Sequence, residues 1–232
     1  MPQLLQFHPQ KRKRRSFFSG LSVNTTLILV NLVFFILMLI LGFFPPIEGD
    51  CSDTICEYIA LKPLNIFQGQ YIWTFITSMF MHGGLGHIFV NMLSLFFVGS
   101  LVERILGPKR YLWFYLISGL FAGLFFVLMS LIWQADINSF AVGASGALFG
   151  LIGLLVLLTP NLPVYVMFVP IPIKMKYAGP GILLVLWLIS SLANIRIGNT
   201  AHLGGLIAGL VYGIYLKNKY KNKTKYISRM FS

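Results

Sequence analysis

Four polar side chains that could share one hydrolytic reaction lie in apolar segments of the chain: Ser145, His202, His87 and Asn91. A serine hydroxyl becomes a nucleophile when an imidazole accepts its proton. Amide and imidazole N–H groups aimed at one point stabilise the oxyanion that such an attack creates. Each residue alone also fits a structural role, because serine packs between helices and histidine or asparagine can join helices by hydrogen bonds. The relative positions of the four decide between catalysis and packing.

The composition is that of a membrane protein. Of the 232 residues, 57% are hydrophobic and 10% are charged, whereas soluble domains carry about 25% charged residues. A helix needs about 20 apolar residues to cross the hydrocarbon, and the uncharged stretches predict six such helices. Their approximate bounds are 23–44, 85–102, 111–135, 142–158, 177–195 and 197–216. The predicted fold class is an all-α polytopic membrane protein, a bundle of six transmembrane helices.

Lysine and arginine predict the orientation, because both accumulate on the cytoplasmic side of membrane proteins. Six spans with both termini in the cytoplasm place all 18 of these residues there except Lys62 and Arg196. The predicted organisation is a basic N-terminal tail (1–20), a catalytic bundle (21–217) and a basic C-terminal tail (218–232). We interpret the basic residues as topology signals and contacts for anionic lipid, not as a nucleic-acid site.

This topology places the four polar side chains at a similar depth. The second, fourth and sixth helices all run from outside to inside. Each carries its polar residues near its start: His87 and Asn91, then Ser145, then His202. Ser145 lies roughly 8 Å below the outer surface if its helix begins near residue 140. Polar groups at such depth usually face the bundle interior or a water-filled cavity and mark function.

Glycines at helical spacing predict a close approach of the fourth and sixth helices. They are Gly143, Gly146, Gly150 and Gly153 on the fourth helix, and Gly205, Gly209 and Gly213 on the sixth. Such stripes let two helix backbones approach closely in lipid. His202 shares the face of Gly205, and Ser145 lies at the flank of the opposing stripe. The hydroxyl and the imidazole are therefore expected within hydrogen-bond reach.

The second helix supplies the predicted oxyanion donors. His87 and Asn91 are four residues apart and therefore share one face of that helix. The backbone N–H of Ser145, near a helix N-terminus, is a third donor. His82 lies five residues before His87, off this face, and is expected to form structural hydrogen bonds to the loop.

Other chemistries fit the sequence less well. The six acidic residues all lie outside the predicted spans, which favours a Ser-His dyad over a triad and excludes an aspartyl protease with two buried carboxylates. The segment after His82 lacks the glutamate of the H-E-x-x-H zinc motif. A small transporter is an alternative, although the polar cluster lies near the outer face and no internal repeat is evident. Cys51 and Cys56, in the first external loop, are compatible with a disulfide or with two free thiols.

Four segments resemble the rhomboids, a family of intramembrane serine proteases. They are "TSMFMHGGLGHIFVNM" (77–92), "ERILG" (103–107), "GASGALFG" (143–150) and "AHLGG" (201–205). Their order and spacing agree with the six-helix form of the family over about 21–216. The resemblance implies that Ser145 is the nucleophile and His202 the general base, and that His87 and Asn91 are oxyanion-side residues.

The resemblance also implies supporting residues and a substrate class. Phe149 takes the position of an aromatic ring that lies against the catalytic histidine, and Gly205 and Gly209 match the close-packing glycines. The expected function is peptide-bond hydrolysis in or near the transmembrane segments of single-pass proteins. The enzyme is expected to act as a monomer in the bilayer of the cell membrane, without a cofactor or a metal. The alternative is an inactive relative that binds membrane clients, although such relatives usually lack the serine or the histidine.

Overall fold

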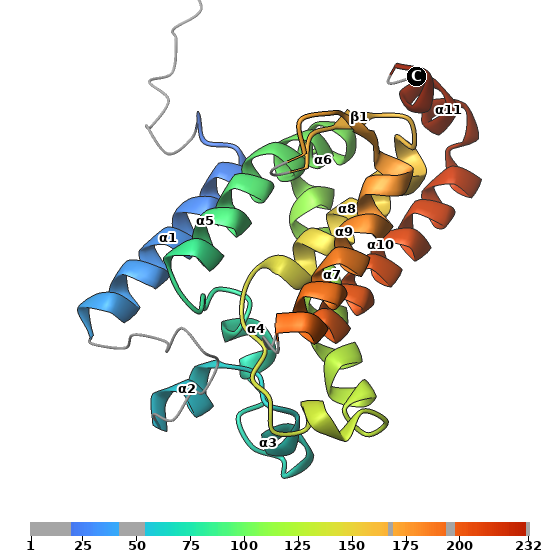
Figure 1. Ribbon diagram of the computed structural model, residues 1–232. Coiled ribbons are helices and arrows are strands. Elements are labelled where there is room, and N and C mark those ends of the chain that lie inside the picture. The colour runs from blue at the N-terminus through green and yellow to red at the C-terminus, as the bar shows by residue number, and fades with distance from the viewer. Residues whose placement is uncertain (1–19, 42–53, 167–168, 194–197, 231–232) are drawn as a thin grey trace, which may run out of the picture.

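The computed structural model describes residues 20–41, 54–166, 169–193 and 198–230. Helices dominate the chain and pack into a bundle with α8 at its centre (Figure 1). The long helices are α1 (Val23–Ile40), α7 (Pro108–Met129), α9 (Met175–Ala193) and α10 (Asn199–Lys219), and the central helix is α8 (Ser145–Leu158). A further long helix runs without interruption through α5 (Leu85–Ser94), the π-helical segment η2 (Leu95–Gly99) and α6 (Ser100–Leu106).

Four helices of the described residues are long and apolar enough to cross a membrane: α1, the continuous helix Leu85–Leu106, α7 and α9. The chain is therefore a multi-pass membrane protein. The central helix α8 is apolar but only 14 residues long, and α10, which has polar residues at both ends, is not among the four. Helices thus occur at all six predicted places, and four of them have the length and hydropathy of a span.

Two helix starts differ from the prediction for local reasons. The third predicted helix starts at Pro108 instead of 111, because Gly107 turns the chain with φ +79° and proline fits the first turn of a helix. It ends at Met129 instead of 135. The fourth predicted helix starts at Ser145 instead of 142, because Gly143 has φ +109°, which lies outside the helical region. The fifth predicted helix starts at Met175 instead of 177. The predicted ends of the first and fifth helices and the predicted start of the sixth lie outside the described residues.

Short elements that the sequence did not predict occupy the loops. The loop after α1 contains α2 (Thr54–Ile59), α3 (Pro63–Phe67) and α4 (Thr74–Thr77), which lie together at one end of the bundle (Figure 1). The segment η3 (Gln134–Asp136) follows α7, and the predicted C-terminal tail contains α11 (Lys221–Met230). An antiparallel pair, β1 (Pro163–Val164) and β2 (Ile173–Lys174), joins α8 to α9, so the chain is not purely α-helical. Cys56 of α2 is disulfide-bonded, and Cys51 lies outside the described residues.

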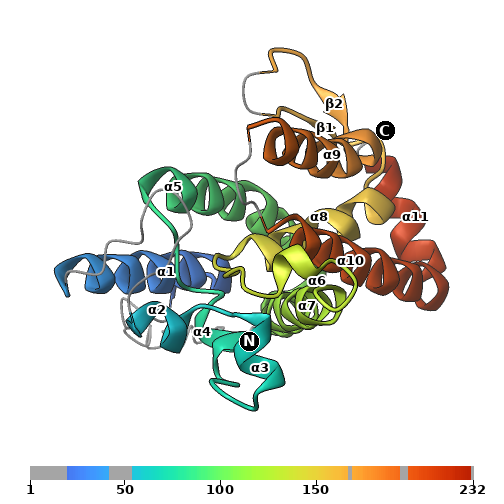
Figure 2. The ribbon, with the colours of Figure 1, turned by 60° about the horizontal axis from the view of Figure 1, so that its bottom comes forward.

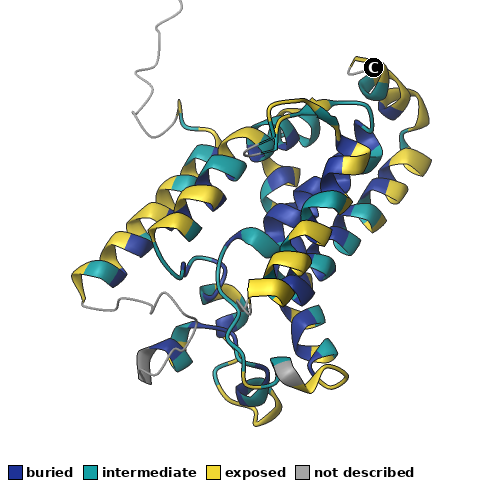
Figure 3. Cartoon of the chain, in the orientation of Figure 1, coloured by how far each residue is buried: buried dark blue, intermediate teal, exposed yellow. Residues whose placement is uncertain are grey.

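The core is centred on α8, which contacts α7, α9 and α10 (Figure 2). Its leucines Leu151, Leu154 and Leu155 are fully buried, whereas Val33 and Ile40 of α1 are exposed (Figure 3). Exposed apolar side chains suit a surface that faces lipid. Because lipid tails are as apolar as leucine, close packing between helices, more than exclusion of water, stabilises this centre.

A polar cluster joins α1 to the continuous helix. The Glu103 carboxylate accepts hydrogen bonds from the N–H groups of Val23 and Asn24 at 2.9 and 3.0 Å. A carboxylate at this place satisfies free N–H groups and opposes the positive end of the helix dipole. Asn24 also donates to the carbonyl of Leu95 at 2.8 Å and accepts from the Tyr111 hydroxyl at 2.6 Å. The glutamate of the "ERILG" segment therefore has a structural role.

Candidate active site

The hydroxyl of Ser145 and the imidazole of His202 are in direct contact. Oγ of Ser145 lies 2.7 Å from Nε2 of His202, which is hydrogen-bond distance. Ser145 is the first residue of α8, and His202 lies in the first turn of α10, where it is buried. The two residues are 57 positions apart in the sequence, and the packing of α8 against α10 brings them together.

Backbone contact between α8 and α10 sets the distance between these side chains. A β-carbon at Gly205 would overlap the carbonyl of Gly146, and one at Gly209 would overlap the carbonyl of Gly150. Gly153 is equally confined, in this case by the carbonyl of Leu206. Because no side chain fits at the crossing, the two helices approach as closely as their backbones allow.

Two of the predicted supporting glycines have other roles. A β-carbon at Gly146 would lie 2.8 Å from Cβ of Ala122, so this position faces α7 while its carbonyl faces Gly205. Gly143 lies outside α8 and forms the turn into it. The prediction of one four-glycine stripe on α8 is therefore wrong, because the glycines of this segment form a turn and contacts with two different helices.

The first loop fixes the turn before Ser145. The N–H of Gly143 donates to the carbonyl of Ser78 at 2.8 Å. Just before it, Ala141 and Leu61 exchange both of their backbone hydrogen bonds, at 2.8 and 3.1 Å. Sequence reasoning missed Ser78 and Leu61, because a main-chain hydrogen bond to a loop requires no particular residue type.

The ring of His87 lies against this turn. Its Nδ1 accepts a hydrogen bond from the N–H of Gly83 at 3.2 Å, so in the neutral ring the proton is on Nε2. A β-carbon at Gly143 would lie only 2.8 Å from that Nε2. The first N–H groups of a helix, here that of Ser145, have no acceptor within the helix. Two hydrogen-bond donors therefore lie at this turn: Nε2–H of His87, which α5 places against Gly143, and the N–H of Ser145.

Asn91 and His82 make local contacts. The Asn91 side chain donates to the carbonyl of His87 at 2.8 Å, and its buried Oδ1 has no partner among the described residues. Nδ1 of His82 donates to the carbonyl of Phe80 at 3.2 Å, as expected for a loop contact. Burial lowers the pKa of His82 to about 3; His87 adds to this shift and the Phe80 carbonyl opposes it. The His82 ring is therefore neutral near pH 7.

The ring of Phe149 stacks on the imidazole of His202. The ring centroids are 4.6 Å apart and the planes differ by 22°. Phe149 lies one turn after Ser145 on α8, so a single helix holds both the nucleophile and the surface against which the imidazole rests. A stacked ring limits rotation of the imidazole and keeps water from that face.

No carboxylate of the described residues supports His202, whose Nδ1 has no partner there. The three acidic side chains in these residues have other contacts: Glu57 pairs with Lys62, Glu103 binds the start of α1, and Asp136 accepts from the Thr200 hydroxyl at 2.8 Å. The remaining acidic residues lie outside the described residues. The geometry is that of a two-residue Ser-His pair.

Comparison with known proteins identifies the family. The family model described as the Rhomboid domain matches residues 69–219, more than half of the chain. This chain belongs to the rhomboid family. RHOMBOID-like protein 1 of Arabidopsis thaliana is 34% identical to this rhomboid over 171 residues, which cover 72% of this chain and 40% of the plant protein. The rhomboid protease GluP of Bacillus subtilis (strain 168) is 30% identical over 187 residues, 76% of this chain and 32% of GluP.

The relatives of this rhomboid differ in activity and location. Inactive RHOMBOID-like protein 8 of Arabidopsis thaliana is 32% identical over 166 residues, 70% of this chain and 43% of that protein. RHOMBOID-like protein 6 of the same plant, named as mitochondrial, is 33% identical over 198 residues, 79% of this chain and 59% of that protein. This rhomboid thus spans less than two thirds of the length of these curated relatives. Family membership therefore establishes that the chain lies in a membrane, whereas evidence for activity has to come from the geometry of the site.

Proposed function

We propose that this rhomboid is an active serine endopeptidase that hydrolyses peptide bonds in or near the transmembrane segments of single-pass membrane proteins. The 2.7 Å contact between Oγ of Ser145 and Nε2 of His202 carries the proposal. A nucleophile within hydrogen-bond reach of a base is the arrangement that covalent catalysis requires. The proposed setting is the cell membrane, with the basic segments 1–20 and 218–232 on the cytoplasmic side of a monomer.

The reaction begins when the Ser145 hydroxyl donates its proton to Nε2 of neutral His202. Oγ then bonds to the scissile carbonyl carbon, and the electron pair of the C=O bond moves to the oxygen. His202 returns the proton to the leaving nitrogen as the C–N bond breaks, which leaves an acyl group on Ser145. Water repeats these steps on the acyl group and releases the second product.

The oxyanion of the intermediate needs hydrogen-bond donors. The backbone N–H of Ser145 and Nε2–H of His87 are the first two, because His87 faces the turn that leads into α8. Asn91 is the third proposed donor. One of its N–H groups donates to the carbonyl of His87, and an amide nitrogen carries a second hydrogen. Donors aimed at the developing charge are the largest single contribution in many hydrolases.

The short length of α8 supports a site below the membrane surface. At 1.5 Å per residue its 14 residues extend about 21 Å, whereas the hydrocarbon core is about 30 Å thick. We propose that its C-terminal end reaches the cytoplasmic surface. Ser145 then lies roughly 9 Å inside the opposite surface of the hydrocarbon, a depth at which a membrane-embedded substrate can reach it.

A serine-reactive fluorophosphonate probe and a single-pass reporter substrate test the proposal on the full-length protein in proteoliposomes. Wild type should take up the probe and cleave the reporter. Ser145→Ala and His202→Ala should each abolish cleavage at an unchanged melting temperature, and the matched control Ser94→Ala should behave as wild type. Residues that act as one unit are not additive, so the double variant should be no slower than either single variant.

Two results would contradict the proposal. Substantial cleavage by Ser145→Ala would remove the assigned nucleophile. A folded wild-type protein that neither takes up the probe nor cleaves would place this chain with the inactive relatives, as a protein that binds membrane clients.

A further inference from the structure

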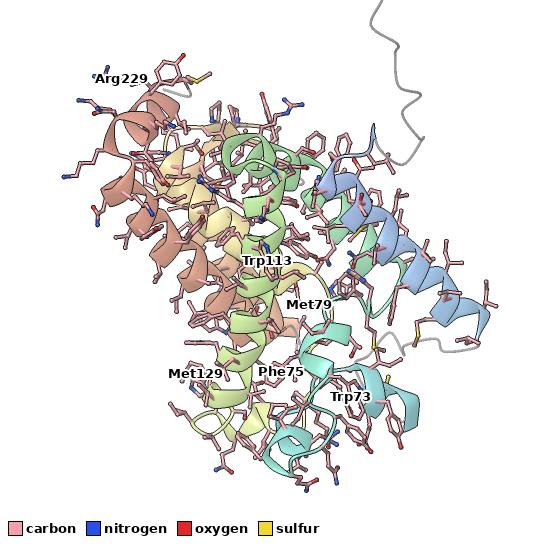
Figure 4. All side chains as sticks on the ribbon, turned by 180° about the vertical axis from the view of Figure 1, so that it is seen from behind. Trp73, Phe75, Met79, Trp113, Met129 and Arg229 are labelled. Atoms are coloured by element: carbon pink, nitrogen blue, oxygen red, sulfur yellow. The ribbon has the colours of Figure 1, made fainter. Side chains whose placement is uncertain are left out.

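A groove lies between α7 and α10, on a surface separate from the Ser-His pair. Its volume is about 760 Å³, within the range of small-molecule sites. Apolar side chains line most of it, among them Trp113, Ile117 and Phe121 of α7 and Val211 of α10. Figure 4 shows the two helices side by side, with Trp113 on α7. We call this feature the α7–α10 groove.

Cations gather at one end of the α7–α10 groove. Lys109 and Arg110 lie in the first turn of α7 and line the groove, and Lys219 ends the antiparallel α10. Arg110 lies over the ring of Tyr220, 5.9 Å from its centroid, and Nζ of Lys219 donates to the hydroxyl of Tyr215 at 2.7 Å. None of the three cations forms an ion pair with a carboxylate of the described residues. This end therefore carries positive charge that no carboxylate of the described residues neutralises.

The length of the groove matches one leaflet of a bilayer. From Lys109 to Phe121 the wall formed by α7 extends about 18 Å at 1.5 Å per residue. One leaflet supplies half of a hydrocarbon core about 30 Å thick, or about 15 Å. A lipid whose headgroup lies at the cationic end would therefore have its acyl chain along the groove as far as the bilayer midplane.

The middle of the groove suits an acyl chain. Ser118 is the polar side chain there, and its hydroxyl already donates to the carbonyl of Phe114 at 2.7 Å. Trp113, Ile117 and Val211 are 58%, 57% and 61% exposed, so a guest can contact their apolar surfaces. The walls therefore favour a hydrocarbon guest over a polar one.

We propose that the α7–α10 groove binds one anionic phospholipid, with its phosphate on Lys109 and Arg110 and one acyl chain along the apolar walls. Basic pockets between transmembrane helices bind anionic headgroups in this way. The cationic end favours an anionic lipid over a zwitterionic one, because the headgroup of a zwitterionic lipid carries a cation that neutralises its own phosphate. The proposal requires only that the chain is embedded in a membrane and is independent of the proposed proteolysis.

Tryptophan quenching by brominated lipid tests the proposal. The full-length protein is placed in nanodiscs of phosphatidylcholine with increasing phosphatidylglycerol that carries brominated acyl chains. The chain has 4 tryptophans. A Trp113→Phe variant gives the fluorescence of the other three, and subtracting it from the wild-type fluorescence isolates the signal of Trp113. Brominated phosphatidylglycerol should quench Trp113 at a lower mole fraction than brominated phosphatidylcholine. Replacing both Lys109 and Arg110 with Gln should raise that mole fraction about thirtyfold, since each of the two cations contributes about 1 kcal/mol near a membrane and about 1.4 kcal/mol corresponds to a factor of ten.

Two controls separate the groove from charge in general. Lys221→Gln with Lys223→Gln removes the same charge from α11 and should leave the quenching unchanged. Ala208→Phe fills the groove and keeps its cations, so it should abolish the preference of Trp113 quenching for phosphatidylglycerol over phosphatidylcholine. Val211→Phe is the substitute if Ala208→Phe does not fold. Two results would show only a general lipid shell and overturn the proposal. One is equal quenching of Trp113 by the two brominated lipids. The other is an equal loss of quenching by brominated phosphatidylglycerol in the Lys109/Arg110 and the Lys221/Lys223 variants. Disulfide crosslinking of Ile117→Cys between two copies would overturn it in favour of a dimer.

Discussion

Gly205 of α10 lies directly on the carbonyl of Gly146 in α8, with no room for a β-carbon between them. Gly146 follows Ser145 in the sequence, and Gly205 comes one turn after His202. The distance between these two backbones therefore determines whether the hydroxyl and the imidazole can share a hydrogen bond. A membrane helix can approach its neighbour this closely only where side chains are absent.

Gly205→Ala should separate α8 from α10 and weaken the Ser145–His202 contact. Overpacking of this kind costs about 1–3 kcal/mol, so we expect a lower melting temperature and at least a tenfold loss of turnover per folded molecule. Gly181→Ala in α9 is the matched control, because a β-carbon there meets nothing within 4 Å. Wild-type turnover in folded Gly205→Ala would show that this contact does not determine the geometry of the pair.

Asn91→Ala separates catalysis from packing at this residue. If the amide donates to the oxyanion, turnover should fall more than substrate binding weakens, because the interaction forms only in the transition state. Loss of one such donor costs about 10²–10³ in rate in a soluble serine protease, and we expect a smaller loss because His87 and the Ser145 N–H share the charge. Turnover and melting temperature are measured on one preparation. A destabilised variant with normal turnover per folded molecule would show that Asn91 has only a structural role.

Glu103→Gln tests the cap on α1. Both carboxylate oxygens accept backbone hydrogen bonds at the start of this helix, and the substitution removes the charge and one acceptor. We expect a loss of about 1 kcal/mol in the free energy of unfolding, the usual cost of a lost cap, with the Ser145–His202 site intact. Glu57→Gln removes a partly exposed ion pair, worth about 0–1 kcal/mol, and serves as the control. Equal melting temperatures for Glu103→Gln and wild type would contradict the capping role.

Labelling with a membrane-impermeant maleimide tests the orientation. After reduction, Cys51 and Cys56 should react from the non-cytoplasmic side. In a variant that lacks both cysteines, Asn222→Cys in α11 should react only from the cytoplasmic side, because an even number of spans places the termini together. Labelling of both sites from the same side would require an odd number of spans and would contradict the shared depth of Ser145, His87 and His202.

The membrane class and the places of the helices follow from the sequence alone, because apolar length is a local property of the chain. The contact between Ser145 and His202 was also predictable, since small residues at helical spacing indicate which helices approach each other. Phe149 against His202 followed from the resemblance to the rhomboids, and the stacked rings agree with it.

Other features depended on contacts between segments far apart in the sequence. Gly143 leaves the helix because its positive φ and its hydrogen bond to Ser78 are set by the first loop. Gly146 faces α7 because α8 is packed among α7, α9 and α10. The spacing of glycines in the sequence does not indicate which of these helices each glycine contacts. The Asn91 amide donates to the carbonyl of His87 in its own helix. Sequence determines which groups can form such contacts, and only the packed chain decides which contacts form, because each competes with others for the same space.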